Sequence, residues 1–302
     1  MKSESSQLRP FATSGPAADA FQAFFDMVDA PAALCDLSLT ILTAGCSRNS
    51  SSPDPTAATS NAPDLTAGAG PAVSTTDRPS ANPERNAYFG NVHVHTGYSF
   101  DAFTNGSKTT PQDAYDWAQG KAITGSGLGP EIRIVTPLDF YAVADHAEYM
   151  GVFNQMSDPN SQFGKLPIAK RVTSPDTVTR MEAFAEVLRE MSAGRSDPQL
   201  ADPAAARSVW AEIVKNADAN YVPGRFTTFA AFEWTSNPDK RNLHRVVMFR
   251  DTAKLPELVM SALDSDKPEA LWAWMEGLRA KGSTLFAIPH NANASDGRMF
   301  EL

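Results

Sequence analysis

The stretch Gly90-Asn-Val-His-Val-His-Thr96 continues a run of β-branched and aromatic residues that predicts a first strand, and it carries two of the chain's five histidines. The other three stand in similar apolar-flanked segments that look like strand ends, each beside another polar group. They are His146, His244 and His290. Neutral imidazole is the commonest side-chain ligand of transition metals, and carboxylates complete such sites. The chain is therefore predicted to be a metal-dependent enzyme.

Strand-like and helix-like segments alternate from residue 86 onward. Strands are expected at 88–94, 138–144, 226–234, 245–249 and 285–288, and helices at 110–120, 176–193, 203–217 and 268–281. This alternation indicates an α/β fold with a mainly parallel sheet. The histidines and Glu233 fall at or just beyond the C-terminal ends of strands, which is the rim where α/β barrels build their chemistry. Four or five strands are too few to close a barrel.

Two of the expected helices have clear sequence signals at their ends. Thr110 is expected to cap one helix, with Pro111 at its first position. The helix expected at 176–193 is amphipathic and stops at Gly194. Its expected apolar face consists of Val178, Met181, Phe184, Ala185 and Leu188.

Composition and charge narrow the classes of function. The chain has 302 residues, of which 42% are hydrophobic, so it can bury one large core. A net charge of -9 and the absence of a Lys/Arg run argue against a nucleic-acid partner. The two cysteines, Cys35 and Cys46, precede the expected folded region, so a metal there must be held by nitrogen and oxygen.

The first 85 residues differ in composition from the rest. Residues 47–85 are dominated by Ser, Thr, Pro, Ala, Asn and Gly, which predicts a flexible linker. Residues 1–46 end in Leu42-Thr-Ala-Gly-Cys46, which resembles the lipobox of a bacterial lipoprotein signal, with Cys46 as the lipidated residue. Asp36 interrupts the apolar run, and the alternative is a disordered N-terminal extension. The first interpretation predicts a periplasmic or outer-membrane-anchored lipoprotein.

The folded segments carry a family resemblance. The order His93-x-His95, Asp101, Asp145-His146, Glu233, His244 and His290 resembles the polymerase-and-histidinol-phosphatase (PHP) superfamily of metal-dependent phosphoesterases. The sequence around these motifs is more similar to the bacterial domain-of-unknown-function family 3604. The matching stretches lie within residues 86–300 and include Tyr88-Phe-Gly-Asn-Val-His-Val-His-Thr96, Ser99-Phe-Asp-Ala102, Ala144-Asp-His-Ala-Glu148, Phe232-Glu-Trp-Thr235, Asn242-Leu-His-Arg245 and Ala287-Ile-Pro-His-Asn291.

The resemblance implies a distorted seven-stranded β/α barrel that holds up to three metal ions. It implies a first ion on His93, His95 and Glu233, a second on Glu233, His244 and His290, and part of a third on Asp101 and His146. Glu233 would then bridge two ions. The nitrogen and oxygen ligands suit zinc, manganese or iron.

One motif of the superfamily does not occur in this sequence. It is an Asp-x-His on a later strand, which would complete the first and third metal sites. We therefore expect the chain to correspond to the N-terminal part of a complete family member, with an incomplete barrel and only the second site fully represented. Such a chain is expected to be less stable and less active than a complete relative.

Further polar residues near these motifs have two interpretations each. Asp145 is expected to hold the imidazole of His146 in place, although it could instead cap a turn. Asn291 and Asn293 could contact substrate or form a turn after Pro289. Arg241 forms, with Lys240 and Arg245, the one basic cluster near the expected site, which could bind an anionic substrate or form a solvated loop.

Three functions are consistent with these motifs. The leading hypothesis is a metal-dependent hydrolase, above all a phosphoesterase that uses metal-activated water on a small anionic substrate. The second is a hydrolase or lyase with the same kind of site and a non-phosphate substrate, because fold does not fix function. The third is an inactive, truncated fragment.

Overall fold

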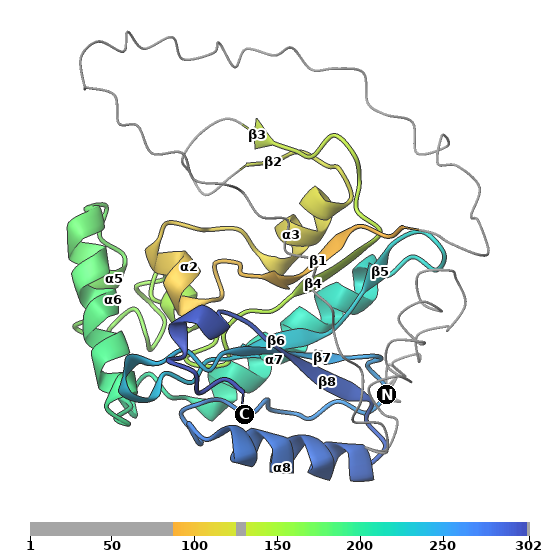
Figure 1. Cartoon of the computed structure of the whole chain (residues 1–302). Helices are drawn as coiled ribbons and strands as arrows, with labels where there is room; N and C mark the ends of the chain where they lie inside the picture. Colours follow the sequence, from red (N-terminus) through yellow and green to blue (C-terminus); the bar gives the residue numbers. More distant parts are fainter. Residues whose placement is uncertain (1–86, 125–130, 301–302) are drawn as a thin grey trace, which may run out of the picture.

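The structure is a computed structural model, and it describes residues 87–124 and 131–300 (Figure 1). The expected lipoprotein signal with Cys46 and the linker at 47–85 lie outside the described residues and stay predictions. Among the helices of the described part, none combines the length and the hydropathy that crossing a membrane would require.

The first sheet is parallel and contains the first strand of the described residues. Strand β1 (Gly90–Val94) pairs with β4 (Phe140–Val143), which pairs with β5 (Thr227–Thr228). Parallel neighbours need long crossovers, and here the crossovers contain helices. The first includes α2 (Phe100–Thr104) and α3 (Pro111–Ala118), and the second includes α4 (Val152–Gln155), α5 (Ala169–Val172), α6 (Thr177–Ser192) and α7 (Pro203–Asn220).

The second sheet is antiparallel, so the prediction of a mainly parallel sheet is wrong for this half of the chain. Strand β6 (Ala231–Trp234) pairs with β7 (Arg245–Phe249), and β7 pairs with β8 (Leu285–Pro289). Residues 235–244 form only a short loop with the 3-10 turn η1 (Pro238–Lys240), and a parallel crossover takes about a dozen residues or more. Helix α8 (Pro268–Ala280) lies in the β7–β8 connection. The described strands form a mixed α/β fold, and no closed barrel is found among them.

Smaller differences from expectation also follow from local pairing. The strand expected at 226–234 is two strands, β5 and β6, because its first part pairs with β4 and its second part with β7. A two-stranded unit that the sequence did not indicate joins β2 (Ile123–Thr124) to β3 (Glu131–Ile132). The turn η2 (Ala292–Ala294) follows β8.

The two larger sheets meet at a single parallel bridge between His146 and Glu233. The backbone N–H of Ala147 donates to the carbonyl of Glu233 at 2.8 Å, and the N–H of Glu233 donates to the carbonyl of Asp145 at 3.0 Å. This bridge places the end of β4 beside β6. It therefore brings polar residues of the two sheets close to one another.

The largest apolar cluster lies between the second sheet and helices α7 and α8. The ring centroids of Trp210 and Phe232 are 6.0 Å apart, and those of Trp210 and Phe249 are also 6.0 Å apart. Edge-to-face and tilted contacts of this kind add to the stabilisation from burial. This cluster supports β6, which carries Glu233.

Helix α6 covers another part of the molecule, beside α2 and α5 (Figure 1). Its fully buried residues are Ala183 and Val187, whereas Val178 is 66% exposed. The expected apolar face is therefore wrong in position: both buried residues lie outside it, and two of its members, Val178 and Ala185, are exposed. Phe184 and Leu188 are half-buried, as residues at the edge of the buried side should be.

The N-terminal cap of α3 offers a test of the local structure. The Thr110 hydroxyl accepts from the Asp113 N–H at 3.2 Å, and the Asp113 carboxylate accepts from the Thr110 N–H at 2.8 Å. We expect Thr110→Ala to lower the free energy of unfolding by about 1 kcal/mol in urea titration. The exposed Thr136→Ala is the control. Equal stability of both variants would contradict the capping interpretation.

Candidate metal centre

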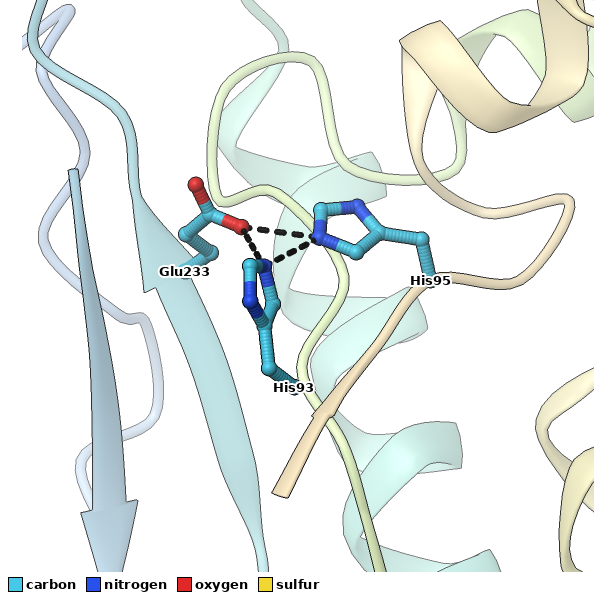
Figure 2. A group of neighbouring side chains, drawn as sticks. All are labelled: His93, His95 and Glu233. Atoms are coloured by element: carbon cyan, nitrogen blue, oxygen red, sulfur yellow. Dashed lines mark hydrogen bonds and ion pairs between the residues drawn. The ribbon is translucent and has the colours of Figure 1, made fainter. Parts of the chain in front are cut away.

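Glu233 lies at the centre of the site, on β6, and its side chain is 1% exposed. One of its oxygens, Oε2, lies 2.8 Å from Nε2 of His93 and 2.8 Å from Nε2 of His95 (Figure 2). His93 is on β1, and His95 follows its last residue. The parallel sheet thus directs both imidazoles across the boundary between the two sheets (the seam), toward a carboxylate of the antiparallel sheet.

The other oxygen of Glu233 faces a second pair of histidines. Oε1 lies 2.7 Å from Nδ1 of His244 and 3.1 Å from Nε2 of His290. His244 immediately precedes β7 and His290 immediately follows β8. Because these strands are antiparallel and Arg245 pairs with Pro289, the start of β7 lies beside the end of β8. The antiparallel sheet that the sequence did not predict is thus what joins this pair.

A third group lies on the side of α2. Asp101 Oδ1 is 3.4 Å from Nε2 of His146 and 3.6 Å from Nδ1 of His95. His95 belongs to the first group as well, and its Nδ1 has another partner, Ser99. The third group therefore depends on Asp101 and His146.

These three groups have the composition and spacing that could hold metal ions. Within each group, one ligand atom per residue lies within 4.8 Å of the others. Nε2 of His93 and Nε2 of His95 are 2.9 Å apart, and two imidazole lone pairs this close require a proton or a cation between them. Buried Nε2 of His244 and Nδ1 of His290 have no hydrogen-bond partner. Nitrogen and oxygen donors of this kind fit a divalent ion.

Ser99 and Asp145 fix the orientation of His95. Nδ1 of His95 lies 2.9 Å from the Ser99 hydroxyl, which in turn donates to Asp145 Oδ1 at 2.8 Å. Ser99 therefore accepts the Nδ1 proton of His95, and the Nε2 lone pair is left for the first group. Outer partners of this kind set the tautomer of histidine ligands.

Asp145 was expected to hold the imidazole of His146, but its contacts lead to a different histidine. Its carboxylate accepts from the N–H and the hydroxyl of Thr96, at 2.6 and 2.7 Å, and from Ser99. Nδ1 of His146 instead contacts the hydroxyl of Thr235. Asp145 therefore positions His95 through Ser99, and Thr235 holds His146.

Ser99, Thr235 and Glu148 were not predicted as site residues. Glu148 Oε1 accepts from the N–H of Thr235 at 3.2 Å and from that of Ala262 at 2.6 Å. It thereby ties the residue after β6 to the 250–267 loop. All three residues stand within the stretches that carried the family resemblance, and that position was the one available signal for them.

Burial and neighbouring charges shift the pKa values in the centre. Burial alone would raise the pKa of Glu233, but the surrounding imidazoles hold it well below its ordinary value. Burial lowers the pKa of His95, but its contacts with Asp101 and Glu233 outweigh this and raise it to about 10. Burial also raises the pKa of Asp145. In the metal-free protein, a proton on His95 thus takes the place that a cation would fill.

A pH titration of the metal-free protein tests this charge balance. His95 has a folded-state pKa of about 10 against 6.5 when unperturbed, so its protonation stabilises the fold fully below pH 6.5. That contribution declines as the pH rises from 6.5 through 10. We expect the melting temperature of the chelator-treated protein to fall across this pH range. The melting temperature of His95→Gln should fall less. An equal decline in both proteins would contradict the assignment.

The remaining residues expected at the site lie at its margin. Arg241 forms an ion pair with Asp296 at 3.0 Å. Asn291 adopts a left-handed conformation with φ 55° directly after His290, and Asn293 lies in η2. Both asparagines are exposed, and the conformation of Asn291 fits its interpretation as a turn residue.

A cavity of about 880 Å³ adjoins the centre. Its lining includes Asp101, His146 and His244 of the centre, and also Lys240. The described residues that line the cavity do not include Arg241, Asn291 or Asn293. Lys240 is therefore the member of the expected basic cluster that is placed to meet a substrate.

The sequence matches a protein-family model described as "Protein of unknown function (DUF3604)" over residues 82–302. No curated protein and no solved structure matches the chain. The match covers most of the chain and includes every residue of the candidate metal centre. The chain therefore belongs to the DUF3604 family of proteins of unknown function.

Proposed function

We propose that this protein is a metal-dependent hydrolase, and more specifically a phosphoesterase that acts on a small anionic substrate. The observation that carries the proposal is the position of Glu233, whose two oxygens each face a separate pair of histidines. A carboxylate shared in this way suits two neighbouring ions. Pairs of ions that clamp the attacking and leaving oxygens recur in phosphatases and nucleases.

The protein's residues divide the work of such a reaction. His93, His95 and Glu233 would hold one divalent ion, and Glu233, His244 and His290 another, with Asp101 and His146 close by. When bound, such ions lower the pKa of water and offset negative charge on the phosphoryl group. Zinc, manganese and iron all suit this donor set. Lys240, in the cavity wall, adds a positive charge for an anionic substrate.

The overall reaction is hydrolysis. The oxygen of water forms a bond to phosphorus, the P–O bond of the ester breaks, and the leaving alkoxide takes up a proton. A monoester gives inorganic phosphate and an alcohol, and a diester gives a monoester and an alcohol. The resemblance of the motif order to the PHP superfamily supports this choice of reaction, and we extend the proposal to a fold related to the PHP barrel.

Metal analysis combined with two single variants tests the metal part of the proposal. We expect protein purified without chelator to hold at least one zinc, manganese or iron ion per chain by elemental analysis. His244→Ala removes a ligand of the pair facing Oε1 and should abolish tight binding there. His146→Ala leaves that pair intact and should retain it. Absence of metal after purification, together with no uptake on titration, would refute the proposal.

A substrate panel tests the phosphoesterase part. Phosphate monoesters and diesters, carboxylic esters and lactones are each incubated with the metal-loaded protein. We expect release of phosphate that disappears with chelator and returns with added metal. Hydrolysis confined to non-phosphate substrates would favour the second hypothesis, and a metal-loaded protein inactive on all of them would favour the inactive fragment.

A further inference from the structure

The cavity beside the metal centre has an apolar wall made by α6. Met181, Phe184 and Leu188 line it, and all three are half-buried. The buried side of the same helix, Ala183 and Val187, packs into the core. Phe184 and Leu188 also pack against that core, so the apolar side of α6 stabilises the fold and its half-buried edge lines the cavity.

Phe100 connects this wall to the metal ligands. Its ring is 1% exposed, and its centroid lies 5.6 Å from that of Phe184 and 4.9 Å from that of His146. Ring contacts therefore run from His146 through Phe100 to Phe184 on α6, and all three residues belong to the cavity lining. A substrate whose reacting group meets His146 and His244 would place its remaining part against the half-buried side chains of α6.

Another part of the lining is polar. It comes from the loop between β6 and β7 and includes Thr235, Asn237, Asp239 and Lys240. Arg189, exposed on α6, lies at the margin of the same cavity. The lining thus combines possible ligands for a cation, apolar side chains of α6, the basic side chains of Lys240 and Arg189, and the acidic side chain of Asp239.

We infer that the substrate is a phosphate ester with a bulky apolar group, of the size of a bicyclic aromatic ring, that lies along α6. This inference rests on the proposed function and specifies its substrate class. A cavity of about 880 Å³ is far larger than a phosphate group needs. Apolar contact on one side with a few polar groups on the other is the usual composition of a site that orients such a ligand.

Calorimetry with two stable phosphonates tests the inference without turnover. Methylphosphonate and (2-naphthylmethyl)phosphonate carry the same anionic group, and their C–P bonds are not substrates of an esterase. For the manganese-loaded protein, we expect the naphthyl compound to bind about 10- to 100-fold more tightly, because its ring loses apolar contact with water. Equal affinity of the two compounds would overturn the inference.

Variants of α6 locate the binding surface. Leu188→Ala should weaken the naphthyl compound roughly tenfold and leave methylphosphonate unchanged. Ala185→Trp, at an exposed position of the cavity wall, should block the naphthyl compound by filling the space. Val178→Ala, on the same helix but outside the cavity lining, is the matched control. Metal content is measured in each variant. Naphthyl binding that survives both Leu188→Ala and Ala185→Trp would overturn the inference.

Failure of the phosphoesterase proposal can be distinguished from failure of the inference about α6 by the binding of a third ligand. Neutral 2-naphthol serves as a third ligand, tested with metal-loaded and metal-free protein. If naphthol binds with the same dependence on Leu188 while neither phosphonate responds to metal, the phosphoesterase proposal is overturned and the apolar class of ligand is supported. If the phosphonates respond to metal but not to α6 variants, the phosphoesterase proposal stands and the inference about α6 fails.

Discussion

Glu233→Gln should abolish stoichiometric metal binding at both histidine pairs. The substitution preserves the shape of the side chain but removes the negative charge from a position that is 1% exposed. Because both oxygens have histidine neighbours, neither pair keeps its carboxylate, and an ion's charge there is left uncompensated. Metal-dependent phosphate release should fall to background. Elemental analysis and isothermal titration measure the loss directly.

The exposed Glu276→Gln on α8 is the matched control for this loss, since it makes the same chemical change at a residue paired with Arg279. The control should bind metal like the unchanged protein. Wild-type metal content in Glu233→Gln would show that the histidines alone form the site. Retention at one pair only would show that the carboxylate is not shared.

Ser99→Ala should weaken the first group by about 10- to 100-fold in metal affinity, the range found for outer partners of histidine ligands. The hydroxyl accepts from Nδ1 of His95 and from the N–H of His146 and donates to Asp145. Its removal leaves the His95 ring free to rotate and to change tautomer. Metal titration followed by competition with a chelator of known affinity measures the change.

Thr104→Ala is the control for Ser99→Ala. It removes another buried hydroxyl from the neighbouring helix, where Thr104 donates to the carbonyl of Phe100 at 2.7 Å. Both variants should lose stability, but only Ser99→Ala should lose metal affinity. An equal loss of affinity in the two would mean that the effect is general destabilisation rather than orientation of His95.

Local sequence patterns predicted the elements well where their ends carry chemical signals. Strand β7 has the predicted bounds of 245–249, and α3 begins after Thr110 as its capping residues require. The strand expected at 226–234 was less accurate, because a run of apolar residues does not reveal that its two halves pair with different neighbours. Strand direction in the second half could not be read either, since it depends on loop length and on packing against α8.

The candidate site was predictable only in part, for a physical reason. His93 and Glu233 are 140 residues apart, and no periodicity links them, so the family resemblance supplied that grouping. The structure brings all seven proposed ligands together. Contacts that decide orientation, such as Ser99 on His95, depend on side-chain directions set by tertiary packing. For that reason Asp145 was assigned to the neighbouring histidine in sequence rather than to the one it reaches through Ser99.

The backbone bridge between His146 and Glu233 has a consequence for how the protein is assembled. His93, His95 and His146 come from the first sheet and its connections, whereas Glu233, His244 and His290 come from the second. The first group therefore straddles the seam, and neither half of the chain can supply it alone. An ion there would link two sheets that otherwise share few backbone hydrogen bonds. Binding of the ion and association of the two sheets would therefore be coupled. Metal supply during folding would then decide how much of the protein reaches its finished form.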